Sequence, residues 1–434
     1  MYWKNGLWCR FVAVVLALVL MLSVLAACGG GGKEKETPTL SPTSTMTVAP
    51  TAISTPTGTT TAAPTATPTP TAIPTATPTP TPEGPVKIGA ICSWSGPAAM
   101  SGLAYGDNIA KLVERQVKDM GGILGGRQLD IVKYDNHLSV AEAQAGALKL
   151  MVDDKVSSII WGGVSAAECE AVAAFCEEHH LLYTPYSSIT DLAKMKYVLG
   201  AMPPIPVTCQ AYIDLALKIA KAKTIGFLGT EISDVHVRLQ VTKDAVEAAG
   251  VKTVFEEYVP EGTTDFTPYL TKLKYANPDV AILESSMGEF YITIAKEIPG
   301  IGGLGNMKIG ILGSGEGAKS IPAADGWYMS TLWYPGLDTP GSVKFVNDYK
   351  AMFNRVPDAT NVYFYNSSWC SIAAIMAAGT TDRETVAQVA RSGKVEWESP
   401  QGHVTWGADG LSDMPGFMVQ IKDKQLIPVE KLER

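Results

Sequence analysis

The chain has 434 residues, 46% of them hydrophobic, and its 43 acidic and 35 basic residues give a formal net charge of −8 at pH 7. A negative balance without a basic cluster argues against a nucleic-acid partner. The seven cysteines and five histidines include no Cys-x-x-Cys and no His cluster with metal-ligand spacing. We therefore expect no metal and no cofactor.

Residues 1–28 have the features of a secretory signal peptide. Lys4 and Arg10 precede and flank an apolar run over residues 11–25, which ends in Leu-Ala-Ala-Cys. The run is slightly shorter than the roughly 20 apolar residues that a membrane-spanning helix needs. The ending resembles the lipobox of bacterial lipoproteins. That resemblance implies cleavage before Cys28, acylation of this cysteine, and an extracytoplasmic protein anchored by lipid to the outer face of the cell membrane.

Residues 29–85 predict a disordered tether, because Thr, Pro and Ala dominate and offer too little apolar surface to form a core. The frequent prolines favour an extended polyproline II conformation of about 3.1 Å per residue. Such a segment would hold a folded domain away from the membrane.

The remaining residues, about 350 in number, exceed what one hydrophobic core usually supports, so we expect two lobes. Strands alternate with helices in two successive series, which predicts an α/β fold with parallel sheets flanked by helices on both faces. The first series has strands at 86–91, 128–133, 156–161 and from 181, and helices at 105–119, 139–153 and 166–178. The second has helices at 208–221, 235–249, 267–275 and 288–298, and strands at 224–228, 252–258, 280–283 and 308–312. Ligands of such sheets lie beyond the carboxyl ends of the strands.

Several short motifs occur in a fixed order along this part of the chain. They are Trp94-Ser95-Gly96-Pro97, Gly121-Gly122-Ile123-Leu124-Gly125-Gly126, Tyr134-Asp135-Asn136 and Trp161-Gly162-Gly163. Together they resemble the leucine/isoleucine/valine-binding family of type I periplasmic binding proteins. The resemblance implies two Rossmann-like lobes joined by three crossovers, with a ligand in the cleft between them. The expected first lobe comprises residues 86–205 plus 332–396, and the second comprises 206–331 plus 397–434.

In that family the first lobe binds the ligand carboxylate after two strands, and the matching residues here are Gly163, Ser165, Tyr186 and Ser188. Short hydroxyl side chains and free amides at a helix N-terminus form a natural anion site. Ser165 could instead be a simple helix N-cap. Trp94 and Ser101 lie in the first strand-to-helix loop, where Trp94 could form an aromatic wall or pack in the core.

The second lobe departs from the family pattern, since Asp234 and Ser286 stand where the family usually has aromatic residues. Glu316 keeps the position of a glutamate that pairs with the ligand ammonium, and Tyr365 that of a late tyrosine. One carboxylate facing an anion site would select a zwitterion such as an amino acid, whereas two would favour a more cationic or hydrogen-bond-rich ligand. Asp234 could alternatively be a solvent-exposed loop acid or helix cap.

The sequence contains no Gly-x-Ser-x-Gly and no catalytic constellation, so we expect no enzymatic activity. The leading hypothesis is a substrate-binding lipoprotein of an ABC transporter that captures an amino acid or similar small polar ligand for a membrane permease. Two alternatives remain open. One is a ligand-sensing receptor for a signalling partner, and the other is a small-amide hydrolase with Asp234 and Glu316 as its acid–base pair.

Overall fold

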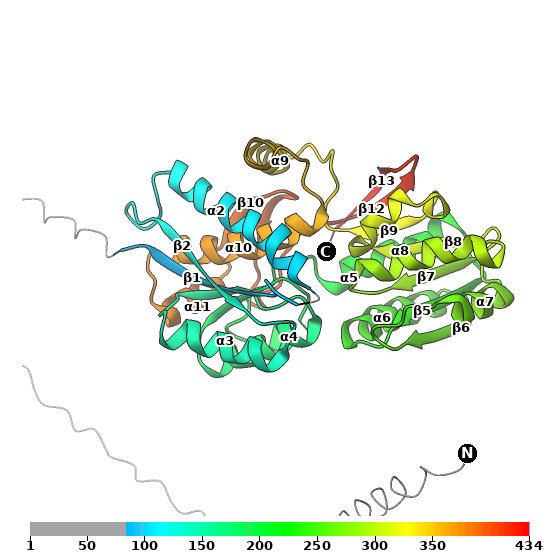
Figure 1. Ribbon diagram of the computed structural model, residues 1–434, viewed down its shortest axis with the longest axis horizontal. Coiled ribbons are helices and arrows are strands. Elements are labelled where there is room, and N and C mark those ends of the chain that lie inside the picture. The colour runs from blue at the N-terminus through cyan, green and yellow to red at the C-terminus, as the bar shows by residue number, and fades with distance from the viewer. Residues whose placement is uncertain (1–83, 97, 190, 434) are drawn as a thin grey trace, which may run out of the picture. The chain divides into compact units, whose positions relative to one another are not determined.

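The computed structural model describes residues 84–96, 98–189 and 191–433 (Figure 1). The predicted signal peptide, Cys28 and all but the last two residues of the predicted tether lie outside this range. Within it, helices and strands alternate, and the strands form one sheet of four, one of seven and a separate hairpin. Among the described residues, no helix combines the length and the apolar content that a bilayer crossing requires.

The first lobe is built on a parallel sheet with the strand order β2–β1–β3–β4. Residues of β1 and β3 are almost completely buried, as is typical of parallel strands covered on both faces. The strands are β1 (Val86–Cys92), β2 (Leu129–Asp135), β3 (Ser158–Trp161) and β4 (Leu182–Pro185).

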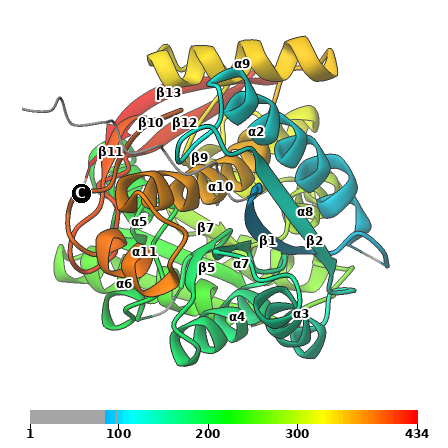
Figure 2. The same cartoon turned by 90° about the vertical axis from the view of Figure 1, so that its left-hand side faces the viewer.

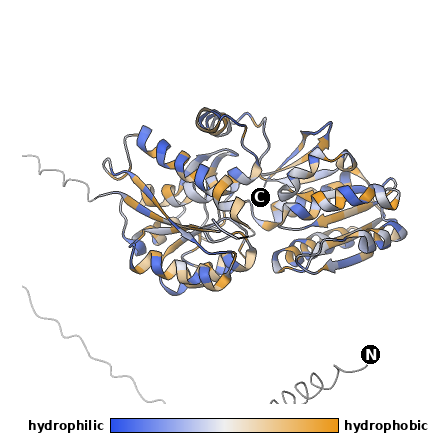
Figure 3. Cartoon of the chain, in the orientation of Figure 1, coloured by the Kyte–Doolittle hydropathy of each residue, from blue (hydrophilic) through white to orange (hydrophobic). Residues whose placement is uncertain are grey.

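Helices cover both faces of this sheet (Figure 2). One face is covered by α3 (Val140–Val152) and α4 (Ala166–Glu178), and the other by α2 (Asp107–Asp119) and α10 (Ala359–Ala378). In α2, the spacing of Ile109, Leu112 and Val113 puts one apolar stripe on the sheet, while hydrophilic residues line its outer side (Figure 3). Two more helices, α9 (Pro340–Phe353) and α11 (Arg383–Ala390), pack against α2 and α10 respectively.

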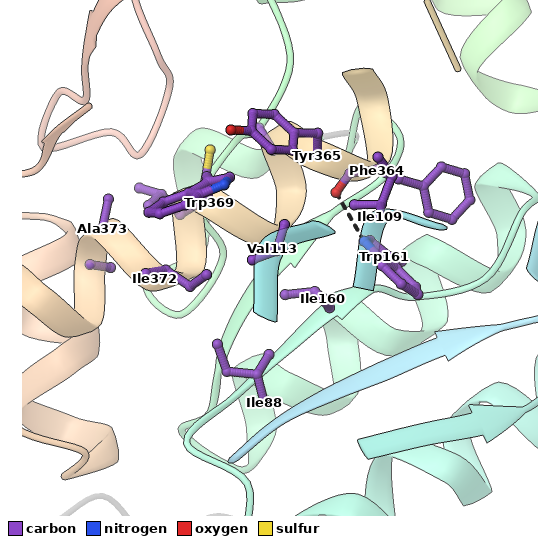
Figure 4. Close-up of a cluster of buried hydrophobic side chains, with 14 of the residues drawn as sticks. Ile88, Ile109, Val113, Ile160, Trp161, Phe364, Tyr365, Trp369, Ile372 and Ala373 are labelled. Carbon is purple, nitrogen blue, oxygen red and sulfur yellow. Dashed lines mark hydrogen bonds between the residues drawn. The ribbon is translucent and has the colours of Figure 1, made fainter. Parts of the chain in front are cut away.

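Helix α10 lies in the middle of the first lobe and is buried around almost its whole circumference. Asp358 caps its N-terminus in a reciprocal pair with Asn361. Below this cap, Phe364 packs edge-on against Trp161, whose Nε1 donates a hydrogen bond of 3.0 Å to the Phe364 carbonyl (Figure 4). This packing ties α10 to the carboxyl end of β3.

The second lobe is built on seven strands in the order β13–β12–β9–β8–β7–β5–β6. The five strands from β5 to β9 are parallel, and the sequence predicts the first four of them but not β9. Strand β12 runs antiparallel to β9 and β13. The strands are β5 (Thr224–Thr230), β6 (Lys252–Val259), β7 (Val280–Glu284), β8 (Lys308–Leu312), β9 (Tyr328–Thr331), β12 (Gly416–Lys422) and β13 (Gln425–Leu432).

Separate hydrophobic cores lie on the two faces of this second sheet. Helices α5 (Ile205–Asp214) and α6 (Ser233–Ala248) cover one face, and α7 (Thr267–Ala276) and α8 (Gly288–Glu297) cover the other. The expected α/β class, with helix-flanked parallel sheets in two lobes, is therefore confirmed.

The core residues show where the chain passes between the lobes. It passes between Ala201 and Val207, between Met329 and Leu332, and between Met414 and Phe417. The third passage lies later than the lobe boundary after residue 396 that we expected from the sequence. The reason is a hairpin of β10 (Glu396–Ser399) and β11 (Gly402–Thr405), which packs against α9 and α10 and buries Val404 in the first core.

Candidate functional site

A cleft with about 680 Å³ of empty space, part of it open to solvent, lies between the two lobes at the carboxyl ends of several parallel strands. Tyr186 follows β4, Ser286 follows β7, and Leu312 ends β8, in agreement with the general position of ligand sites in parallel α/β sheets. The lining residues are Tyr186, Ser187, Ser188, Met202, Pro203, Thr208, Asp234, Arg238, Ser286, Leu312, Ser314, Ser330, Thr331, Leu332, Thr360, Tyr363 and Gly416.

Hydroxyl groups dominate the lining of this cleft, since ten of its seventeen lining residues are Ser, Thr or Tyr. Hydroxyls can both donate and accept hydrogen bonds. Met202, Pro203, Leu312 and Leu332 add apolar surface, and an adjoining pocket lined mainly by apolar residues shares Met202 and Pro203 with the cleft. The surface as a whole suits a small polar ligand with a limited apolar part.

A buried ion-pair cluster forms the second-lobe wall of the cleft. Arg238 Nη2 lies 2.9 Å from Asp234 Oδ2, and Arg238 Nε lies 2.7 Å from Glu284 Oε1. Asp234 and Arg238 are each 4% exposed and Glu284 is fully buried. Helix α6 creates this arrangement, because its first turn carries Asp234 and the next turn carries Arg238 on the same face.

The contacts within this cluster change the pKa values of Arg238 and Glu284. Burial alone would lower the pKa of Arg238, but the Glu284 and Asp234 carboxylates beside it raise that pKa above its usual range. Burial raises the pKa of Glu284, and the charge of Arg238 and a hydrogen bond from the Tyr212 hydroxyl oppose this rise. Arg238 therefore stays cationic at every physiological pH.

The two carboxylate oxygens of Asp234 have different surroundings. Oδ2 accepts a hydrogen bond of 2.7 Å from Ser286 Oγ in addition to its contact with Arg238. Oδ1 is buried and has no hydrogen-bond partner among the described residues. Asp234 is thus neither a solvent-exposed acid nor a helix cap, the two alternatives that its sequence context left open.

The structure brings four of the predicted site residues together around the cleft. Tyr186 and Ser188 line it from the first lobe, and Asp234 and Ser286 line it from the second. Arg238 and Tyr363 also line the cleft, and the sequence prediction missed both. The spacing of four residues between Asp234 and Arg238 is a signal for a helical ion pair that could have identified Arg238.

The other five predicted residues of the first lobe, Tyr365 among them, do not line the cleft. Ser101 begins the π-helical turn before α2, and Gly163 lies against the Glu168 side chain. Ser165 is the N-cap of α4 and forms a reciprocal capping box with Glu168. Its hydroxyl is therefore used by the helix end, as the N-cap alternative proposed.

Trp94 packs in the first lobe instead of forming a wall of the cleft. Its indole Nε1 donates a hydrogen bond of 2.8 Å to Asp107, and its ring centroid lies 6.2 Å from that of Trp161. These contacts agree with the packing alternative for Trp94.

The sequence resemblance placed Tyr365 and Glu316 in the ligand site, but neither residue lines the cleft in the structure. Tyr365 is 5% exposed and donates a hydrogen bond of 2.9 Å to Gln116 inside the first core, beside Trp369 (Figure 4). Tyr363 lines the cleft instead, because two residues correspond to about 200° around a helix. Glu316 is 7% exposed and is not among the residues that line the cleft. It forms an ion pair with Lys319 and accepts a hydrogen bond from Ala359 N.

Two lobes that enclose a polar cleft at the ends of their strands define a protein that binds a small ligand. The chain belongs to the periplasmic binding protein family, because the model of that family matches residues 85–425. This match confirms the resemblance that the sequence motifs indicated.

Individual relatives agree with this assignment. The Leu/Ile/Val-binding protein of Escherichia coli (strain K12) is 24% identical over 357 residues, covering 78% of this chain and 90% of that protein. A leucine-binding protein from Thermotoga maritima has a TM-score of 0.71 at 21% identity, covering 80% of this chain and 98% of that one. A solute-binding protein of an ABC transporter from R. palustris, solved in complex with benzoate, has a TM-score of 0.70 at 20% identity, covering 81% and 98%.

Proposed function

We propose that this chain is an extracytoplasmic solute-binding lipoprotein, which captures an amino acid or a similar small polar molecule and delivers it to an ABC permease. The observation that carries this proposal is the hydroxyl-lined cleft between two lobes, with the Asp234–Arg238 pair in its wall. Membership of the periplasmic binding protein family supports it. So do a relative named as a Leu/Ile/Val-binding protein and a solute-binding protein of an ABC transporter that was solved in complex with benzoate.

Ligand binding in such a cleft gains from contacts with both lobes at once. Tyr186 and Tyr363 belong to the first lobe, while Asp234 and Ser286 belong to the second. A ligand that contacts both walls favours the arrangement in which the lobes are close, to the extent that it binds this arrangement more tightly. A permease could then distinguish the loaded protein from the empty one.

The hydrolase alternative has less support than a binding role. It requires Asp234 and Glu316 to act together on a substrate as an acid–base pair. Glu316 is paired with Lys319 and bound to Ala359 N, and it does not line the cleft. Asp234 is itself paired with Arg238 and accepts a hydrogen bond from Ser286 Oγ. We therefore place transport before catalysis.

The binding function is tested by measuring the melting temperature of the full-length lipoprotein, purified in detergent, with a panel of amino acids, small amides and aromatic acids. A ligand at one hundred times its dissociation constant should stabilise the protein by about 2.7 kcal/mol. A shift of several degrees with one class would support the proposal and identify the ligand class. Conversion of a small amide into product by the purified protein would contradict it.

The lipid anchor is tested separately through Cys28. We expect the wild-type chain in the membrane fraction of a bacterial host and labelled by a radioactive fatty acid. The variant Cys28→Ser should lose the label, because the acylated sulfur is absent. Cys9→Ser, which changes a cysteine within the predicted signal peptide, is the matched control and should keep it. Equal labelling of wild type and Cys28→Ser would contradict the lipoprotein assignment.

A further inference from the structure

We infer that the second-lobe wall of the cleft offers hydrogen-bond acceptors that select a ligand of net positive charge, and that this charge is carried by a cationic nitrogen group. A basic amino acid is the simplest molecule of this class. The inference rests on the proposed function, which it deepens by naming the ligand chemistry.

The unpartnered oxygen of Asp234 is the first observation. Oδ1 is buried, has no partner among the described residues, and belongs to a side chain that lines the cleft. Leaving a buried polar group without a hydrogen bond costs about 1–3 kcal/mol, and more for a charged group. A donor that enters through the cleft would remove this cost. An ammonium or guanidinium group satisfies a carboxylate best, because charge-assisted hydrogen bonds are the stronger ones.

The neighbouring hydroxyls are the second observation. Ser314 Oγ donates to the Ser285 carbonyl at 2.9 Å, and Ser330 Oγ donates to the Thr208 carbonyl at 2.7 Å. Because a carbonyl can only accept, the hydrogen of each hydroxyl is already used. The oxygens of Ser314 and Ser330, both in the cleft lining, are therefore left as acceptors. A ligand with several N–H groups can therefore donate hydrogen bonds to both of these oxygens.

The charge balance is the third observation. Asp234 and Arg238 are the two charged residues in the lining, and Glu284 lies directly behind them in contact with Arg238. The cluster thus holds two carboxyl groups against one guanidinium in a buried place, where an uncompensated charge is costly. Arg238 already has two carboxylates as partners, so a ligand carboxylate would have to compete with both. A ligand cation instead completes the charge balance.

The test uses isothermal titration calorimetry on the full-length lipoprotein with pairs of ligands that differ in one group. Norleucine lacks only the side-chain ammonium of lysine, and citrulline replaces the guanidinium of arginine with a neutral urea. Leucine and benzoate are added as ligands without a side-chain cation. We expect lysine or arginine to bind at least tenfold more tightly than its neutral counterpart. A result in which norleucine, citrulline, leucine or benzoate binds most tightly would overturn the inference but support the proposed function.

Variants then assign the preference to Asp234. Asp234→Asn keeps the size of the side chain and should reduce the preference for the basic ligand at least tenfold, with a smaller effect on the neutral one. Asp244→Asn is the matched control, since Asp244 lies on the same helix and is exposed. A preference that survives Asp234→Asn unchanged would also overturn the inference. The comparison of ligands on the wild-type protein stands even if Asp234→Asn fails to fold. Absence of binding by all six probes would contradict both the inference and the proposed amino-acid ligand.

Discussion

The carboxylate of Glu316 in the second lobe accepts a hydrogen bond of 3.1 Å from the backbone amide of Ala359, the first residue of α10 in the first lobe. The same carboxylate forms an ion pair with Lys319. A negative charge at a helix N-terminus is favourable, because the free amides and the helix dipole carry partial positive charge there. Glu316 therefore links the lobes directly, without a ligand between them.

We expect Glu316→Gln to weaken this link between the lobes and thereby to lower ligand affinity by a few-fold to tenfold. The variant replaces a hydrogen bond to a charged group with one to a neutral amide, a difference of about 1 kcal/mol. Small-angle scattering of the ligand-free protein should show a larger radius of gyration for the variant. An unchanged radius together with weaker binding would indicate that Glu316 contacts the ligand itself, as the sequence resemblance implied.

Removing a tyrosine hydroxyl at either of two positions of α10 should distinguish a residue of the cleft from a residue of the core. Tyr363→Phe changes a side chain that lines the cleft, so ligand affinity should fall while the melting temperature of the free protein stays close to that of wild type. Tyr365→Phe removes the hydrogen bond to Gln116 and should lower the free energy of unfolding by about 1 kcal/mol with no change in affinity. Calorimetric titration and denaturant unfolding of both variants measure the two effects, and the reverse pattern would contradict the placement of these tyrosines.

The variant Ser165→Ala should destabilise the protein rather than impair ligand binding. Ser165 Oγ accepts a hydrogen bond from Glu168 N at 3.3 Å, and Glu168 Oε2 accepts one from Ser165 N at 2.8 Å. Loss of an N-cap hydroxyl costs about 1 kcal/mol. Urea unfolding measures this loss, and calorimetry should find the affinity unchanged. A fall in affinity without a fall in stability would return Ser165 to the ligand site.

Asp279 predicts a pH-dependent contribution to stability. Its Oδ2 accepts hydrogen bonds from the backbone amides of Lys223 and Thr224, at 2.8 and 3.0 Å, and these bonds lower the pKa of Asp279 below its ordinary value of 3.8. A lowered pKa in the folded state means that the stabilisation is fully present above about pH 4. It is lost as the pH falls through the lowered pKa.

We therefore expect Asp279→Asn to melt at a lower temperature than wild type at pH 7, and the difference between the two melting temperatures to shrink as the pH falls below 3.8 toward the lowered pKa. Melting curves across this range provide the measurement. Asp325→Asn offers a control with a single backbone hydrogen bond, from Asp423 N. A difference between wild type and Asp279→Asn that is equal at pH 7 and pH 3 would contradict the assignment to this carboxylate.

Several parts of the fold and site follow from local sequence patterns. The alternation of buried strands and helices predicts the parallel strands from β5 to β8, because a strand that is covered on both faces is apolar along its length. Asp234 was assigned to the site through the family resemblance, because it stands at the position of a family aromatic residue after the first strand of the second lobe. The antiparallel β12 and β13 were not predicted from the sequence, since the direction of an added edge strand depends on how the chain crosses between lobes.

Which residues face the cleft could not be derived from the sequence of α10. This helix is buried on nearly all sides, so it has no polar face that would show its orientation, and Tyr363 and Tyr365 look equivalent in the sequence. Their different environments follow from the rotation of the helix against the first sheet.

The sequence by itself determined the α/β class, the division into two lobes and the family, because these depend on periodic burial and on short motifs that each act over one turn or strand. The tertiary structure alone decided that Arg238 joins Asp234 to Glu284, that Glu316 reaches Ala359 in the other lobe, and that Tyr363 lines the cleft. These contacts depend on how helices rotate and how the lobes approach each other. Both are set by packing between residues that are far apart in the chain.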